Sequence, residues 1–252
     1  MATLRFEREA DFVTLRLDRP HGNAINAEMV EELSRALAEI ERDPGLRGAL
    51  LASAHPRIFC PGLDLLELAP LGWDEMSGFL DRFCDCYRRL FSFPKPVVAA
   101  IAGHAVAGGC LLSLCADYRV LQAEGAMLGL NEVRLGVPLP WGAAVIVRQS
   151  VFPSKLAEVV MLGRNFTGEA AVAAGLAQEL APAGEVEKVA RERLAEFLSK
   201  DPAALASLKG SLRGEAERSM REGDRARAKE FLDIWFSPST RKLVDEAVRA
   251  LR

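Results

Sequence analysis

Apolar and polar positions alternate near the start of the chain and then change to a helical period. Residues 4–6 and 12–17 (FVTLRL) alternate as the strands of a partly solvated antiparallel hairpin do. From 27 to 42 the apolar residues recur every three or four positions, which predicts an amphipathic helix. Asn26 stands at the expected N-cap, and Asp43-Pro-Gly predicts the end of this helix.

The middle of the chain repeats an order of strand, loop and helix. Apolar runs at 46–53, 97–101 and 118–121 predict buried strands, and 76–91 and 108–116 predict helices. The order recurs although the residues themselves do not repeat. We therefore expect an α/β core of parallel strands, with loops gathered at their carboxyl ends, where ligands usually bind.

The last part of the chain predicts helices only. They are expected at 185–199, 203–212, 215–231 and 240–251. The stretch GEAERSMREGDRARAKE alternates in charge sign, which favours a solvated helix face over a nucleic-acid-binding arm. Long amphipathic helices at one end of a chain suit self-association. We divide the chain into a core, 1–195, and a C-terminal helical region, 196–252.

Composition narrows the function classes. The chain has 252 residues, half of them hydrophobic, and a net charge of −3, so neither nucleic acid nor an anionic membrane is an expected partner. Residues 97–116 carry no Lys, Arg, Asp or Glu, but a buried strand, a glycine turn and a buried helix explain them better than a membrane span does. The first residues lack the apolar stretch of a signal peptide, so a cytoplasmic location is expected.

Cysteine and histidine give no sign of a metal or disulfide framework. The five cysteines are odd in number and irregularly spaced, and Cys84 and Cys86 lack the C-x-x-C spacing of zinc and redox sites. The three histidines form no ligand cluster. We expect ordinary reduced thiols and no bound metal.

Two loops of similar design carry the candidate chemistry. Ile58–Asp64 (IFCPGLD) and Gly103–Cys110 (GHAVAGGC) each follow a predicted strand and precede a helix. Glycine permits close backbone approach, and the first amides of a helix have no partner inside it. Two such amides converging on one point would form an oxyanion hole. Either loop alone is weak evidence, because glycine pairs also serve close packing.

The two loops belong to a series of blocks that resembles the enoyl-CoA hydratase/isomerase (crotonase) superfamily, and within it the mitochondrial-type Δ3,Δ2-enoyl-CoA isomerases most. The blocks are Arg19-Pro with Asn23–Asn26, Phe59–Asp64, Lys95-Pro with Gly103–Cys110, Cys115–Arg119, Gly129–Gly136 and Thr167–Leu176. The resemblance implies a crotonase-like spiral of ββα units with a C-terminal helical region that builds homotrimers or dimers of trimers. Pro61 and His104 depart from the residues usual there, without touching the implied mechanism.

The resemblance also implies an acyl-CoA thioester as substrate, with no cofactor beyond the CoA that the substrate carries. The thioester oxygen would accept hydrogen bonds from the amides of Leu63 and Gly108, and Glu132 would be the catalytic acid/base. Implied substrate-binding residues are Ala24, Pro61, Gly62, Leu63, Asp64, Leu65, Gly108, Gly109, Leu111 and Leu135. Arg19, Arg57 and Lys209 are unranked candidates for the CoA phosphates.

The number of carboxylates separates the reactions of this superfamily. Its hydratases carry two glutamates, but here the first of those positions is Leu111 and only the second, Glu132, is acidic. Hydration requires deprotonating water and protonating Cα, work that two carboxylates share. Shifting a double bond from C3 to C2 requires one base that moves a proton from C2 to C4. We therefore predict a 3-enoyl-CoA to trans-2-enoyl-CoA isomerase.

Two alternatives stay open. The first is an enoyl-CoA hydratase or another crotonase reaction, with a second polar group drawn from Asp64, Glu67, Asp74 or Asn131. The second is a catalytically silent acyl-CoA-binding protein. On composition alone Glu132 would be a solvated loop residue or a partner of Arg134, and its place in the block Gly129–Gly136 is what favours catalysis.

Overall fold

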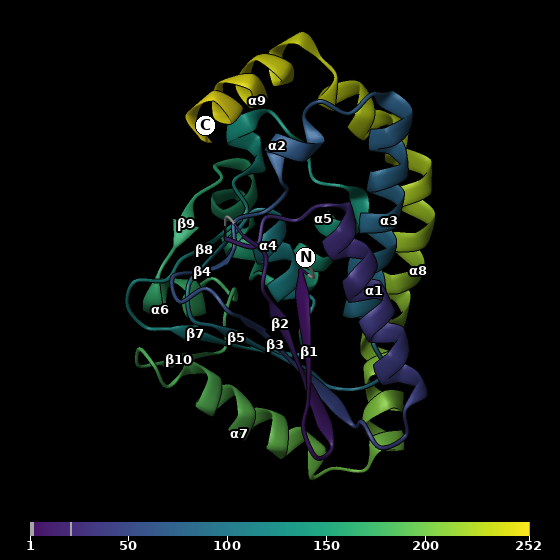
Figure 1. Cartoon of the computed structure of the whole chain (residues 1–252), viewed down its shortest axis with the longest axis vertical. Helices are drawn as coiled ribbons and strands as arrows, with labels where there is room; N and C mark the ends of the chain where they lie inside the picture. The colour runs from purple at the N-terminus through teal and green to yellow at the C-terminus, as the bar shows by residue number, and fades with distance from the viewer. Residues whose placement is uncertain (1–2, 21, 252) are drawn as a thin grey trace.

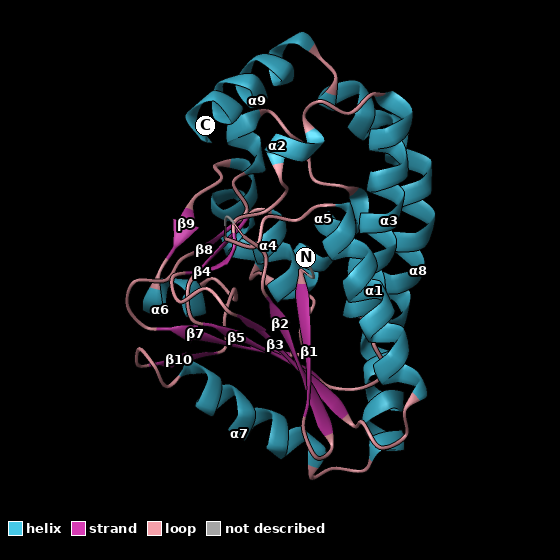
Figure 2. Cartoon of the chain, in the orientation of Figure 1, coloured by secondary structure: helices cyan, strands magenta, loops and turns pink. Residues whose placement is uncertain are grey.

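The computed structural model describes residues 3–20 and 22–251, so His21 lies outside the described residues. A six-stranded sheet in the order β1-β2-β3-β5-β7-β10 runs through the middle of the molecule (Figures 1 and 2). Its strands are Leu4–Arg8, Phe12–Leu17, Gly48–Ser53, Val97–Ile101, Tyr118–Gln122 and Glu179–Ala181. The predicted hairpin β1–β2 is antiparallel, and every other neighbouring pair is parallel.

A second, smaller sheet was not predicted. It contains β4 (Ile58–Cys60), β6 (His104–Val106), β8 (Leu128–Gly129) and β9 (Asn165–Phe166), in that order. Strands β4, β6 and β8 are parallel, and β9 is antiparallel to β8. The expectation of loop throughout the two glycine segments was therefore wrong. Each of these strands has two or three residues, which is too short to show a period, and its partners lie far away in sequence.

The helices alternate with these strands. They are α1 (Ala27–Arg42), α2 (Leu65–Leu68), α3 (Trp73–Phe91), α4 (Gly108–Leu114), α5 (Trp141–Ser150), α6 (Gly168–Ala173), α7 (Val186–Leu198), α8 (Pro202–Trp235) and α9 (Pro238–Leu251), with short helical turns η1 (Glu132–Leu135), η2 (Pro153–Lys155) and η3 (Ala157–Met161). The large-sheet strands β3 and β5 are each followed by a small-sheet strand and then a helix, which confirms the predicted ββα spiral. Asn26 caps α1 as predicted, since its side chain accepts a hydrogen bond from the Met29 amide at 3.0 Å.

The C-terminal helical region is present, with one correction. The expected helices 203–212 and 215–231 are a single helix, α8, of 34 residues. Gly214, which falls in the expected gap, does not end the helix, because packing of α8 against α3 and α5 outweighs the low helix propensity of glycine. The proposed boundary between 195 and 196 lies inside α7.

The core lies on both faces of the large sheet. One face packs against α1, α3, α4 and α5, and α7 covers the other face through Val186, Ala190 and Leu194 (Figure 1). The charge-free segment 97–116 is β5, β6 and α4 inside this core. In the described part of the chain, no helix is both long enough and apolar enough to cross a membrane.

All five cysteines are free and buried. Burial raises the pKa of each thiol, for example to about 12 at Cys60 and Cys110. Within residues 3–20 and 22–251, no group of three or more His, Cys, Asp or Glu side chains is arranged to hold a metal ion.

Candidate active site

The two glycine loops meet behind one cavity. Gly62, between β4 and α2, has a φ of +102°, and a Cβ there would lie 2.8 Å from the Cβ of Ala107 and 3.2 Å from the Gly108 nitrogen. A side chain at position 62 is excluded both by that φ and by this contact. The loop after β4 and the loop after β6 are therefore in van der Waals contact, as the convergence hypothesis requires.

The Leu63 amide is oriented by its neighbours. The Ile25 amide donates to the Gly62 carbonyl at 2.7 Å, and the Asp64 amide donates to the Ile25 carbonyl at 2.8 Å. These two bonds form a parallel bridge between Ile25 and Leu63. In such a bridge the central residue's own N–H points to the other side, so the Leu63 amide faces away from Ile25.

A buried ion pair holds this loop from behind. Arg19 contacts the Asp64 carboxylate at 2.6 Å, with the two side chains only 11% and 9% exposed, and it also pairs with Glu67. The other Asp64 oxygen caps α2 by accepting from the Leu66 amide at 2.9 Å. Because both of its oxygens are engaged, the Asp64 carboxylate serves the loop rather than the cavity.

The Gly108 amide is the first of α4 and follows a strained residue. Ala107 has φ +48° and ψ −128°, a region that costs a residue with a side chain about 1–3 kcal/mol. Its own amide donates to the Gly129 carbonyl at 2.8 Å. At Gly109, a Cβ would lie 2.0 Å from the Cys60 carbonyl oxygen. Glycine is thus required for the start of α4 to lie directly on β4.

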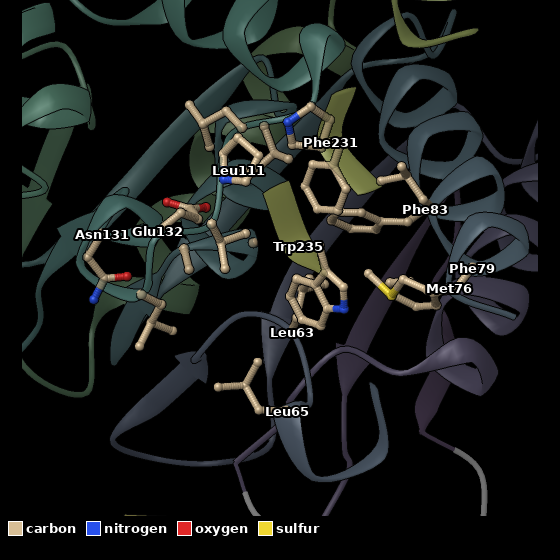
Figure 3. A pocket seen from close by; sticks show the side chains of 18 of the residues that line it. Leu63, Leu65, Met76, Phe79, Phe83, Leu111, Asn131, Glu132, Phe231 and Trp235 are labelled. Carbon is tan, nitrogen blue, oxygen red and sulfur yellow. The ribbon is translucent and has the colours of Figure 1, made fainter. Parts of the chain in front are cut away.

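A cavity of about 170 Å³ lies in front of both loops, between α3, η1 and the end of α8 (Figure 3). Its lining is mostly hydrocarbon and aromatic. The lining residues are Pro61, Leu63, Leu65, Met76, Phe79, Leu80, Phe83, Ala107, Gly108, Leu111, Asn131, Glu132, Leu135, Val137, Pro138, Leu139, Pro140, Phe231 and Trp235. Among these described residues, Glu132 is the one titratable group.

The carboxylate of Glu132 lies among apolar side chains. It begins η1, and its Oε2 is buried without a hydrogen-bond partner in the described structure. Burial raises the pKa of this carboxyl from 4.5 to about 7, although a hydrogen bond from its own amide opposes the shift. Leu111, 2% exposed, lines the same cavity from α4. At neutral pH such a group can both accept and return a proton.

Comparison of the sequence with models of known protein families identifies the family of this chain. A family model described as Enoyl-CoA hydratase/isomerase matches residues 7–246. The chain belongs to the enoyl-CoA hydratase/isomerase family. Its reaction is accordingly one on an acyl-CoA thioester.

Individual members of the family carry different activities. Over 221 residues the chain is 31% identical to the carnitinyl-CoA dehydratase of Proteus mirabilis, covering 88% of this chain and 84% of that one. The human mitochondrial delta3-delta2-enoyl-CoA isomerase superposes with a TM-score of 0.95 at 25% identity, over 99% of this chain and 98% of that one. A Mycobacterium tuberculosis protein, described as an enoyl-CoA isomerase in one structure and as a probable enoyl-CoA hydratase in another, superposes with a TM-score of 0.85 at 29% identity, over 91% of this chain and 99% of that one.

Most of the predicted site residues come together. The residues predicted from the family blocks that line the cavity are Pro61, Leu63, Leu65, Gly108, Leu111, Glu132 and Leu135. Gly62 and Gly109 lie behind them and permit the close approach of the loops. Ala24 and Asp64 do not line the cavity, and both contact Arg19. Of the candidates for a second polar group, Asn131 lines the cavity, whereas Asp74 is exposed on α3.

The three side chains that are candidates for binding the CoA phosphates differ in exposure and in whether they already form ion pairs. Arg19 is already paired with Asp64 and Glu67. Lys209 is buried and paired with Asp117 at 2.6 Å, about 33 Å along α8 from Phe231. Arg57 is exposed beside the loop after β3. Arg57 is therefore the candidate of the three with an accessible charge.

Sequence reasoning missed the wall opposite Glu132. Met76, Phe79 and Phe83 from α3 lie beside Phe231 and Trp235 from α8, on the side of the cavity away from Glu132 (Figure 3). The available signal was an apolar i, i+3, i+4, i+7 stripe on one helix and an i, i+4 aromatic pair in an otherwise charged helix. Neither pattern distinguishes a cavity wall from ordinary core.

Proposed function

We propose that the protein converts 3-enoyl-CoA to trans-2-enoyl-CoA. The observation that carries this proposal is the lone carboxylate of Glu132, whose Oε2 is buried without a hydrogen-bond partner, in a cavity whose other described lining residues do not titrate. The fold similarity to the human mitochondrial isomerase supports it.

In the proposed mechanism Glu132 moves one proton. Its carboxylate removes a proton from C2, and the C2–H electrons form a dienolate whose negative charge lies on the thioester oxygen. The protonated Glu132 then delivers the proton to C4, where the electrons of the C3–C4 double bond form the new C4–H bond. The C1–C2 electrons of the dienolate shift to C2–C3, and the charge on oxygen returns to the thioester carbonyl. No other reactant is required, and the product double bond is conjugated with the thioester carbonyl.

The amides of Leu63 and Gly108 would hold the dienolate oxygen. Their loops are in contact, and the Leu63 N–H faces away from Ile25. Loss of one donor from such a hole typically costs about 2.7–4 kcal/mol of transition-state stabilisation. The strain at Ala107 fits this assignment, because strained residues persist where the surrounding structure enforces a functional geometry.

A dehydratase or hydratase is the second candidate function. Similarity to carnitinyl-CoA dehydratase favours it, as does the presence of Asn131 in the cavity lining. Removing or adding water requires proton transfer at an oxygen on C3 as well as at C2. An amide can hydrogen-bond to that oxygen but has no proton to transfer at neutral pH, so the lining favours isomerisation.

The decisive experiment compares substrates. Purified protein should raise the absorbance of the conjugated thioester when mixed with 3-enoyl-CoA, and Glu132→Gln should lose at least about 100-fold in kcat. Glu169→Gln, an exposed glutamate on α6, is the matched control and should retain full activity. Efficient hydration of crotonyl-CoA without isomerisation of 3-enoyl-CoA would refute the proposal. Tight CoA binding without any turnover would identify a silent binder.

We also propose a homotrimer or a dimer of trimers. Leu208 and Leu212 lie one turn apart on α8 and are 61% and 76% exposed, which is unusual for leucine on a charged helix. Light scattering coupled to gel filtration should give a mass of three or six chains. A monomeric mass would refute this assembly.

A further inference from the structure

The candidate active-site cavity is open at one end and closed at the other. Pro61 is exposed, and Leu65, Asn131, Leu135 and the segment 138–140 are partly exposed, so a substrate can enter on the side of these loops. On the side of α3 and α8 the lining side chains are buried. They are Met76 at 0%, Phe79 at 1%, Leu80 at 3%, Phe83 at 4%, Phe231 at 5% and Trp235 at 0% exposure. The cavity therefore ends inside the core.

Stacked aromatic rings close that end. Phe231 and Trp235, one turn apart on α8, lie with ring centroids 6.3 Å apart and planes 13° from parallel. Phe79 and Phe83 repeat the arrangement on α3, at 5.9 Å and 12°. Paired aromatic rings pack in fixed relative orientations, and moving one disturbs its partner. A longer acyl chain could extend past these rings only by displacing side chains that are packed against one another.

The volume sets the size of group that fits. An apolar cavity of about 150 Å³ holds one benzene ring, so a cavity of about 170 Å³ takes slightly more than six carbons. We infer that the protein acts on short to medium straight acyl chains of about six to eight carbons, and that Phe231 and Trp235 set this limit. The inference rests on the proposed function for its reaction and on the cavity alone for its length.

The kcat/KM should first rise and then fall as the acyl chain of the substrate is lengthened. Each methylene that enters the apolar cavity should raise kcat/KM by up to about 4-fold, through the free energy of burying it. Beyond about eight carbons the added methylenes have no space, and kcat/KM should drop at least about 10-fold by twelve carbons. The measurement uses trans-3-enoyl-CoA substrates of six, eight, ten and twelve carbons.

A substitution at the closed end tests the assignment of the wall. Phe231→Ala should move the optimum to ten or twelve carbons, and Trp235→Phe, a smaller change that is easier to fold, should shift it in the same direction. Phe236→Ala is the matched control: Phe236 stacks on Trp73 at 5.4 Å and does not line the cavity. Its optimum should stay at that of the unaltered protein.

Binding separates the length limit from the chemistry. Calorimetric titration with hexanoyl-CoA and dodecanoyl-CoA needs no turnover, and hexanoyl-CoA should bind at least about 10-fold more tightly. That result without any isomerase activity would support the inference and refute the proposed function. Equal or tighter binding of dodecanoyl-CoA, or the same optimum in Phe231→Ala and Phe236→Ala, would overturn the inference.

Discussion

Replacing Glu132 with glutamine removes the charge of this side chain while keeping its shape. In the folded protein burial holds the pKa of Glu132 at about 7, against 4.5 for a free side chain. Between these two values the folded state binds more protons than the unfolded chain, so the free energy of unfolding falls as pH rises. The stability that is present below pH 4.5 is lost as pH passes through about 7. Glutamine does not titrate and lacks this loss.

The magnitude follows from the two pKa values. The charged form of Glu132 costs the folded state about 1 kcal/mol at pH 5 and about 3 kcal/mol at pH 8. The free energy of unfolding of Glu132→Gln, relative to that of the unaltered protein, should therefore rise by about 2.5 kcal/mol from pH 5 to pH 8. For a chain of this size that corresponds to roughly 5–10 °C in the difference of the two Tm values.

Thermal unfolding of both proteins at pH 5, 6, 7 and 8 measures this difference. The other titrating groups are shared by the two proteins, so their contributions cancel in the comparison. Glu169→Gln, which changes an exposed carboxylate, should give a difference that does not vary with pH. Two parallel Tm curves for Glu132→Gln and the unaltered protein would show that the folded state does not raise the pKa of Glu132.

Three other outcomes are expected. The kcat/KM of the proposed isomerisation should rise with pH through about 7, because Glu132 must be charged to accept the C2 proton. A kcat/KM that is flat from pH 5 to 9 would contradict this. Gly109→Ala should lower the free energy of unfolding by about 3 kcal/mol or more, since its Cβ would lie 2.0 Å from the Cys60 carbonyl oxygen. Gly210→Ala, with open space around it on α8, should raise the free energy of unfolding by about 0.5–1 kcal/mol. Denaturant titration measures both. Ala107→Gly should keep or raise the Tm by relieving strain but lower kcat, because the Gly108 amide is less firmly held; an unchanged kcat would argue against that role.

Local signals accounted for much of the fold. The helix 27–42 could be predicted because its cap, its apolar stripe and its stop are all within a few residues of one another. Strands β4 and β6 could not, because three residues show no period and their pairing joins segments more than 40 residues apart. The expected break between 212 and 215 does not occur, because α8 continues through it and packs along its length against α3 and α5.

Some residues of the candidate site could be predicted from local sequence, and others could not. Glu132, Leu63 and Gly108 could be proposed from short blocks, because each block lies within a few residues of the chain, and the structure places all three on one cavity. Phe231 and Trp235 lie about 100 residues further along the chain and reach the cavity only because α8 folds back over α3. A wall made of two distant helices leaves no local pattern in sequence.

The length of α8 links two distant parts of the molecule. Asp117 pairs with Lys209 and Arg213 near the start of this helix, which fixes its position against the sheet, while Phe231 and Trp235 lie near its end. Deleting one residue between those points would turn both rings by about 100° and draw them back by about 1.5 Å. Insertions and deletions in the middle of α8, remote from any substrate, are therefore a route by which related chains could evolve different acyl preferences.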